Sequence, residues 1–273
     1  MERVINSSIT ARKTRKINLS ERRCRFKIMK PRIKVCWISA GVSSFVAGWL
    51  ERESIDKYMY IDVSDQHSDS IRFIKDCEKI LEKPIEILQS AEYHSVGDVC
   101  RAFRFVNSAN GAKCTQVLKR RVRKQWEFEN QNYSITYVWG MDVDEKHRAD
   151  RIVETMSCFE HEFPLIDREL TKHDAHGICK ELGIKRPAMY DMGYSNNNCI
   201  GCVKGGAGYW NKIRVDFPEV FADRANMERE IGHSILHNDK GMIFLDELDP
   251  NAGRMDKEIM EDCSIFCQMA VDK

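Results

Sequence analysis

The sequence predicts an α/β fold with a doubly wound, mostly parallel sheet. A β-branched apolar run at 33–38 is followed by small residues, by an apolar helical segment at 45–52 and by a second strand-like run at 57–63. Strand, helix and strand in this order form the βαβ unit of parallel sheets. With 273 residues, 42% of them hydrophobic, the chain is long enough for one large domain with a sizeable core.

Later segments continue the alternation of strands and helices. Four apolar residues at helical spacing predict a helix over 69–81, with Ser68 as its N-cap. A capping box formed by Thr171 and Asp174 predicts another helix over 171–182. The other expected elements are strands at 84–88, 134–139 and 242–245, and helices at 96–106, after Cys114, past Arg151 and at 218–236.

Charge is balanced over the whole chain but not along it. Lysine and arginine total 43 and aspartate and glutamate total 42, so the net charge gives no argument for a nucleic-acid partner. Residues 1–30 are rich in lysine and arginine, with only Glu2 and Glu21 as acids. This basic N-terminal arm, expected to be disordered, suits contact with an RNA or DNA backbone. The alternatives are a solvated tail and a gene start placed too early, since Met29 directly precedes the first strand.

A loop of small residues separates the first predicted strand from the first helix. Small side chains let backbone N–H groups approach an anion, hydroxyls add donors, and the positive end of the following helix faces the loop. We interpret the loop as a phosphate cradle, with an ordinary tight turn as the alternative. Its residues are Ser39, Ala40, Gly41, Val42, Ser43 and Ser44.

Cys114 and the basic segment after it form a second candidate site. Cys114 stands just before a predicted helix that is rich in lysine and arginine, and both a helix N-terminus and nearby cations lower the pKa of a thiol. The sequence therefore predicts a reactive thiolate at Cys114, with Lys119 as its catalytic or anion-binding neighbour. A solvated charged helix face is the alternative. Gly140, at the carboxyl end of a later strand, permits close backbone approach.

Two cysteine pairs give the most specific metal signal among the chain's 11 cysteines. Cys199 and Cys202 form a CxxC in a loop rich in Gly and Asn, and Cys263 and Cys267 form a second pair near the C-terminus. Four thiolates from two segments suit a tetrahedral site, and the spacing fits both iron–sulfur and zinc. A redox dithiol and inert cysteines are the alternatives. His233 and His237 have the spacing of a two-histidine metal face on a helix, but no Glu stands between them as a general base, so we expect surface histidines.

Several of these segments, in order, resemble one family. The loop at 39–44 is similar to the SGGxDS loop of the PP-loop ATP pyrophosphatases and of the phosphoadenosine phosphosulfate (PAPS) reductases. Ser39, Gly41 and Ser44 match it, whereas Ala40 and Ser43 replace its second residue and its Asp. Further matches are His67 and Asp69 after the second strand, Cys114, Thr115, Leu118 and Lys119 of a CTxxLKxxP stretch, Gly140, Glu145 and Arg148 of a GxRxxES/AxxR segment, and Cys199 and Cys202 of a CxxC followed by Gly-Gly and a Trp.

The resemblance implies a Rossmann-like domain of the adenine nucleotide α-hydrolase type over 31–190, with a cysteine-rich helical region over 191–273 packed on it. It implies that ATP or PAPS, with magnesium as an accompanying ion, binds to the loop and to the other matching residues. It also implies a [4Fe–4S] cluster, with zinc as the alternative metal. The nucleotide-binding residues would be the six of the loop together with His67, Asp69, Gly140, Glu145 and Arg148, the last making a bidentate phosphate contact.

The reaction implied by the resemblance is an enzymatic one of sulfur chemistry. Its two versions are reductive cleavage of an adenylyl sulfate and ATP-dependent adenylation of an acceptor that then receives sulfur, with a protein as sulfur or electron donor. The alternatives are a catalytically inactive nucleotide- or nucleic-acid-binding protein and a zinc-stapled structural protein. Because no run approaches the ~18 apolar residues of a membrane span and no signal-peptide core is seen, we expect a soluble cytoplasmic protein without a membrane partner. The sequence leaves the oligomeric state open.

Overall fold

The computed structural model describes residues 30–108, 111–239, 241–258 and 263. Residues 1–29 of the predicted basic arm, and the predicted metal ligand Cys267, lie outside this part of the chain. The described residues from Pro31 onward belong to one compact unit. The predicted regions 31–190 and 191–273 therefore belong to the same unit.

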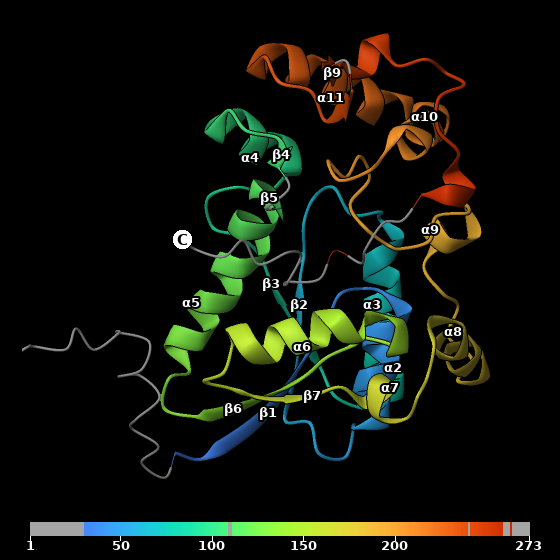
Figure 1. The fold of residues 1–273 in the computed structure, drawn as a ribbon. Helices are drawn as coiled ribbons and strands as arrows, with labels where there is room; N and C mark the ends of the chain where they lie inside the picture. The colour runs from blue at the N-terminus through green and yellow to red at the C-terminus, as the bar shows by residue number, and fades with distance from the viewer. Residues whose placement is uncertain (1–29, 109–110, 240, 259–262, 264–273) are drawn as a thin grey trace, which may run out of the picture. The chain divides into compact units, whose positions relative to one another are not determined.

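Five parallel strands form the central sheet and confirm the predicted α/β class (Figure 1). Their order is β3-β2-β1-β6-β7, with Val35 of β1 paired to Lys57 of β2 and to Tyr137 of β6. The edge strand β7 was not predicted, since its three residues, Glu-His-Glu, have no apolar run. The strands are β1 (Arg32–Ile38), β2 (Lys57–Ile61), β3 (Ile85–Leu88), β6 (Ser134–Val138) and β7 (Glu160–Glu162).

Helices follow most strands, as the alternating sequence pattern indicates. The main helices before β6 are α2 (Val42–Leu50), α3 (Asp69–Leu81), α4 (Val96–Phe103), the π-helix η1 (Thr115–Arg120) and α5 (Arg121–Glu129). The later ones are η2 (Val143–Glu145), α6 (Lys146–Thr155), α7 (Pro164–Asp167), α8 (Lys172–Glu181), α9 (Ala188–Asp191), α10 (Ala207–Asp216), α11 (Pro218–Ile231), η3 (Leu245–Glu247) and η4 (Met255–Lys257). Two hairpins complete the described elements: β4 (Asn107–Ser108) with β5 (Gly111–Ala112), and β8 (Leu236–Asn238) with β9 (Gly241–Ile243).

Alternate residues of β1 face two helix layers, which confirms that the sheet is doubly wound. Cys36 and Ile38 pack with α2, α3 and α8 on one face, and Val35 and Trp37 pack with α5 and α6 on the other. This alternation is the period of two expected of a strand buried on both faces. A third apolar cluster joins α4, η1, α10 and α11 and holds Cys114, Cys199 and Cys202.

Several predicted element ends differ from the structure for local reasons. The helix predicted over 218–236 ends at Ile231, because Gly232 adopts the left-handed conformation (φ 77°) that commonly terminates helices. The chain then forms the β8–β9 hairpin in place of one closing strand at 242–245. Ser68 makes no capping hydrogen bond, and the Nδ1 atom of His67 accepts one from the backbone N–H of Asp69. The capping box of Thr171 and Asp174 is confirmed.

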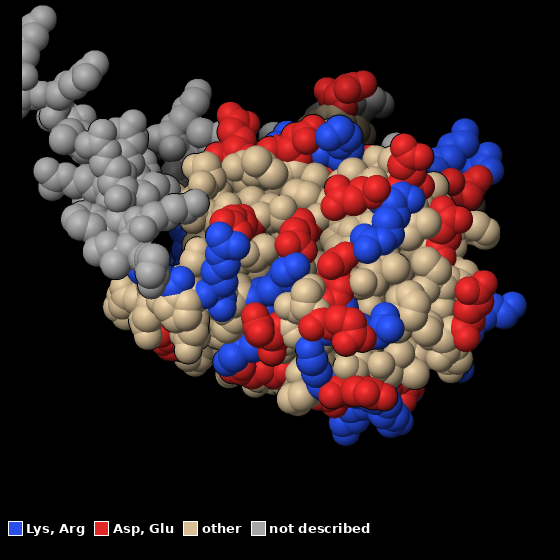
Figure 2. Space-filling view, turned by 90° about the horizontal axis from the view of Figure 1, so that it is seen from below, with Lys and Arg blue, Asp and Glu red and all other residues tan. Residues whose placement is uncertain are grey.

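Surface charge is mixed on the face of the molecule seen from below in Figure 1. Figure 2 shows lysines and arginines interspersed there with aspartates and glutamates over the described atoms. The described helices include none with the length and apolar character needed to cross a membrane. On the face shown in Figure 2, the described lysines and arginines therefore form no patch of a single charge.

Candidate functional site

A pocket opens where the order of the strands reverses. The chain builds β1, β2 and β3 outward in one direction and then places β6 on the other side of β1. Ligands of doubly wound sheets bind outside the carboxyl ends of the strands at such a switch point. The pocket is lined by Trp37, Ile38, Ser39, Ser44, Ile61, Gln66, Lys119, Trp139, Gly140, Met141, Glu145, Arg148 and Cys263.

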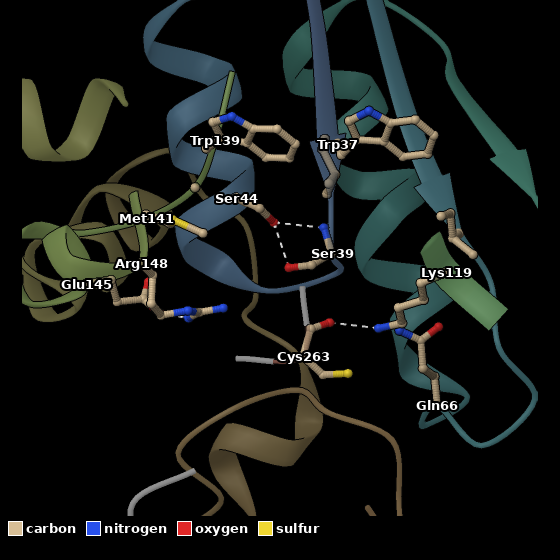
Figure 3. Close-up of a pocket in the computed structure, with 13 residues that line it drawn as sticks. Trp37, Ser39, Ser44, Gln66, Lys119, Trp139, Met141, Glu145, Arg148 and Cys263 are labelled. Atoms are coloured by element: carbon tan, nitrogen blue, oxygen red, sulfur yellow. Dashed lines mark hydrogen bonds and ion pairs between the residues drawn. The ribbon is translucent and has the colours of Figure 1, made fainter. Parts of the chain in front are cut away.

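The predicted phosphate loop leads from β1 into α2 at this pocket. The Ser44 hydroxyl accepts a hydrogen bond from the backbone N–H of Ser39 (2.9 Å), lies 3.1 Å from the Ser39 hydroxyl and donates to the Gly41 carbonyl (2.9 Å). These bonds close the loop into a compact turn, with Ser39 and Ser44 facing the pocket (Figure 3). The buried hydroxyl of Ser43 has no hydrogen-bond partner among the described residues.

Ala40 adopts a left-handed backbone conformation within this loop, with φ of 58°. That conformation costs a non-glycine residue roughly 1–2 kcal/mol. The loop pattern that the sequence resembles has Gly at this position, so the structure gives a physical reason for that preference. The Ala40 carbonyl accepts a hydrogen bond from the Asn197 side chain (2.8 Å), which helps to hold the strained turn.

Gly140 confirms the close backbone approach predicted at the end of β6. A Cβ atom built on Gly140 would lie 2.2 Å from Ser44 Cα and 2.5 Å from Ser44 N. The chain after β6 therefore runs directly against the start of α2, where only glycine fits. This contact sets the distance between the phosphate loop and the segment that carries Glu145 and Arg148.

Two cationic side chains reach the pocket from opposite sides. Figure 3 shows Arg148 on one side, Lys119 on the other and Cys263 between them. Arg148 is buried and donates to the Glu145 carboxylate, which fixes its direction. The buried Lys119 ammonium donates to the Cys263 carbonyl (2.7 Å). Lys119 lies in the π-helix η1, a rare helix type that is frequent at functional sites.

Several pocket residues were missed by the sequence reasoning. Trp37, Trp139 and Met141 lie at or just beyond the carboxyl ends of β1 and β6, and Gln66 lies beyond β2. Their positions in the sequence could have indicated them, because the carboxyl ends of predicted parallel strands meet at one edge of the sheet. The two tryptophans add aromatic surface to a pocket that also presents apolar, charged and amide side chains.

His67 and Asp69 are not among the residues that line this pocket. The Asp69 carboxylate pairs with Arg72 (2.7 Å) and accepts a hydrogen bond from the backbone N–H of Ala188 (2.8 Å). These contacts hold the pKa of Asp69 below its usual range, chiefly through Arg72. The His67 ring packs edge-on against Phe217, with centroids 6.2 Å apart. In this structure both residues fix the start of α3.

Four buried cysteines influence one another electrostatically beside the pocket. The side chains of Cys199, Cys202 and Cys263 are 5–9% exposed, and the nearby thiols contribute to raising the pKa of the fourth, Cys114. The Tyr209 hydroxyl braces the CxxC loop, since it accepts from the Cys202 N–H (2.9 Å) and lies 3.2 Å from the Cys199 carbonyl. The cluster thus joins the predicted nucleophile to three of the four predicted metal ligands.

The low thiol pKa predicted for Cys114 is wrong. Burial, followed by the neighbouring thiols Cys263 and Cys202, raises the pKa of Cys114 well above its ordinary value. The basic residues after it do not offset this effect, and two of them, Arg121 and Lys124, lie on the surface. A thiolate at Cys114 therefore requires a bound cation or another partner.

His233 and His237 do not share a helix face. His233 follows the end of α11 and His237 lies in β8, although their rings are 5.1 Å apart. Over the described ranges, no group of three or more His, Cys, Asp or Glu side chains is already arranged to hold a metal ion. The cysteine cluster is thus defined by the burial of its members and by their mutual effect on thiol pKa.

No protein-family model matches the chain, and no curated protein matches it. The chemistry of the site accordingly follows from its own residues. Arg148 and Lys119 suit an anion, the tryptophans suit a planar group, and the buried Cys263 also lines the pocket. The pocket can hold a ligand with both an anionic and an aromatic part.

Proposed function

We propose that the pocket binds an adenine nucleotide and that the protein is an enzyme of sulfur chemistry. The observation that carries this proposal is that Cys263 lines the pocket and also belongs to the cysteine cluster. The Ser39–Ser44 turn and Arg148 supply donors for phosphate groups at the switch point. A sulfur-handling centre beside a nucleotide site agrees with the PAPS reductase-like motifs of the sequence.

The cysteine cluster suits a soft metal or an iron–sulfur centre. Thiolates are the ligands that such centres prefer, and burying several thiols together is favourable when a cation replaces their protons. Cys199, Cys202 and Cys263 are three proposed ligands. Cys114, which the structure describes near them, and Cys267 are the two candidates for the fourth position. A bound [4Fe–4S] centre would supply redox chemistry or a site for sulfur.

Two reactions fit this arrangement. In reductive cleavage, the bond between the sulfate sulfur and the phosphate oxygen of an adenylyl sulfate breaks, and two electrons from a donor protein or dithiol yield sulfite and the nucleotide. In sulfur transfer, an acceptor attacks the α-phosphate of ATP, pyrophosphate leaves, and a sulfur donor then displaces AMP. Arg148 would hold a phosphate or sulfate oxygen in either case, oriented by Glu145. Magnesium would accompany ATP in the second.

Nucleotide binding is tested by isothermal titration calorimetry with ATP and adenylyl sulfate. We expect binding by the wild type and at least a tenfold loss in Arg148→Gln, about 1.4 kcal/mol or more. Arg254→Gln is the matched control, since Arg254 pairs only with surface Asp256 among the described groups. Equal affinity of the wild type and Arg148→Gln would contradict the proposed site.

The metal is tested by anaerobic purification, absorption spectroscopy and analysis of iron, sulfide and zinc. We expect the metal to be lost in Cys199→Ser and kept in Cys179→Ser, because Cys179 is buried in a different core. Loss of metal in Cys114→Ser would make Cys114 a ligand, whereas retained metal with lost turnover would make it the nucleophile. A metal-free wild type would contradict a resident centre.

A zinc-stapled structural role is the second candidate. It is favoured by the burial of the cysteine cluster, since structural zinc sites are closed to solvent. The backbone N–H of Cys263 donates to Asn198 (2.7 Å), so the C-terminal segment is already tied to the CxxC loop. Stoichiometric zinc without iron or sulfide would favour this role.

A further inference from the structure

Gln66, which no motif singled out, has a side chain of fixed orientation in the pocket. Its Oε1 atom accepts hydrogen bonds from the backbone N–H of Val63 (3.2 Å) and from the Tyr60 hydroxyl (2.5 Å). A backbone N–H can only donate, so the atom that faces it must be the amide oxygen. Burial raises the pKa of Tyr60, which keeps its hydroxyl protonated as a donor.

The fixed oxygen leaves the Nε2 group as the polar part of the Gln66 side chain that is available to a ligand. Gln66 is half-buried and lines the pocket, and Nε2 has no hydrogen-bond partner within the described part of the chain. In Figure 3 Gln66 and Lys119 lie across the pocket from Arg148. The pocket therefore presents an ammonium, a neutral amide and a guanidinium around one space, and these three groups are all hydrogen-bond donors.

We infer that Gln66 determines specificity by donating a hydrogen bond from Nε2 to an anionic oxygen of the ligand, a phosphate or sulfate oxygen bound in the pocket that Lys119 and Arg148 also line. The inference deepens the proposed function and rests on it for the identity of the nucleotide. An amide N–H forms a stronger hydrogen bond with an ionised oxygen than with a neutral acceptor, which favours a phosphate or sulfate oxygen over an atom of the base. Recognition of the uncharged base by Gln66 is the rival outcome.

The sharpest test is Gln66→Glu, which keeps an oxygen for Val63 and Tyr60 and replaces the donor by a carboxylate. We expect ATP and pyrophosphate to bind at least tenfold more weakly, and adenosine to change by less than about threefold, because only the first two bring negative charge. Gln66→Met, which adds no charge, should weaken ATP and pyrophosphate by roughly three- to tenfold. Gln125→Glu adds the same charge at an exposed position of α5 and should leave the affinity for ATP and for pyrophosphate unchanged.

The outcomes separate this inference from the proposed function. An equal loss of affinity for ATP and for adenosine would show that Gln66 binds the base. Unchanged ATP binding in both Gln66 variants would remove its role. In each of these cases the proposed nucleotide site would still stand. If pyrophosphate binding depended on Gln66 but the wild type did not bind ATP, the inference would be supported. The proposal that the pocket binds an adenine nucleotide would then be contradicted. A wild type that binds none of the three probes would overturn both.

Discussion

At the scale of single residues, Gly140 couples the two halves of the pocket. Any Cβ atom there would overlap the backbone of Ser44, and backbone atoms cannot move aside as a flexible side chain can. The Ser39–Ser44 loop and the segment after β6 can therefore approach this closely only because residue 140 has no Cβ atom. A substitution at this point should act on folding and on ligand binding together.

Gly140→Ala should lower the free energy of unfolding by about 1–3 kcal/mol through overpacking. Gly177→Ala is the matched control, because Gly177 lies inside α8 and a Cβ atom there would meet no other atom within 4 Å. Alanine is the better helix former there, so this control should be neutral or up to about 1 kcal/mol more stable. Urea unfolding of both variants measures the difference, and an unchanged midpoint in Gly140→Ala would contradict the contact.

Glu228 is a buried carboxylate that joins three segments. Its two oxygens accept hydrogen bonds from the backbone N–H groups of Ile235 and Leu245, the latter at 2.6 Å. Desolvation raises its pKa to about 7, and these two donors only partly offset the effect. The carboxyl group of Glu228 therefore links the end of α11 to the residue before β8 and to η3. Its burial disfavours the charged form.

The raised pKa of Glu228 predicts that stability falls as pH rises. Because the folded pKa of about 7 exceeds the ordinary value of 4.5, the contribution is complete below about pH 4.5 and is lost as pH rises through 7. We expect a loss of roughly 1–3 kcal/mol across this window. Urea unfolding at several pH values measures it. Glu228→Gln should be less stable at low pH but should lack this part of the slope, and an unchanged slope would exclude Glu228 as its source.

At the scale of elements, the CxxC segment supports the phosphate loop. Asn197 is buried and donates to the Ala40 carbonyl (2.8 Å) and to the Ser70 hydroxyl (3.0 Å). Asn198 accepts from the backbone N–H of Cys263. Neighbouring residues of one loop thus fix the strained turn before α2 and the backbone at the cysteine cluster.

Asn197→Ala should destabilise the protein by about 1–3 kcal/mol, because it leaves buried acceptors without their donor. It should also weaken ATP binding several-fold, since the left-handed turn at Ala40 loses its support. Asn251→Ala is the control, because Asn251 is exposed and its side chain reaches only Asp249 among the described residues. Calorimetry and urea unfolding of both variants test this, and unimpaired ATP binding by Asn197→Ala would contradict the supporting role.

The sequence predicted elements better than it predicted contacts. The helix at 69–81 and the strand at 134–138 follow from apolar periodicity, which is a local signal. The strand β7 was missed because its residues have no such pattern. Likewise, the charge run after Cys114 indicated a low thiol pKa, but burial decided the opposite, and burial depends on packing with segments more than 80 residues away.

The candidate site shows the same division. Ser39, Ser44, Lys119, Gly140, Glu145 and Arg148 were predicted and line the pocket, since each lies in a motif at a predicted strand end or helix start. Gln66 and the two tryptophans were missed because their role depends on which strands are neighbours in the sheet. That order could not be read from the spacing of apolar residues.

At the scale of the whole molecule, Asp65 ties the sheet to the helices around the cysteine cluster. It lies beyond β2, pairs with the buried guanidinium of Arg224 in α11 and accepts from the backbone N–H of Val96 (2.5 Å). Its carbonyl accepts from the N–H of Ile200, inside the CxxC loop (2.7 Å). Breaking one partner of such a pair leaves a buried charge uncompensated.

Arg224→Met should therefore lower the free energy of unfolding by about 3–5 kcal/mol. Arg254→Met, which breaks an ion pair whose side chains are 66% and 62% exposed, should change it by less than about 1 kcal/mol. Arg224→Met should also expose Cys199 and Cys202 to a thiol reagent faster than the wild type, because Asp65, whose carbonyl accepts from Ile200, is then no longer held by Arg224. Urea unfolding and labelling rates measure both effects. Fast labelling without a loss of stability would mean that the cysteine cluster opens independently of the sheet, whereas fast labelling together with a loss of stability would show that the pocket and the cluster form one cooperative structure.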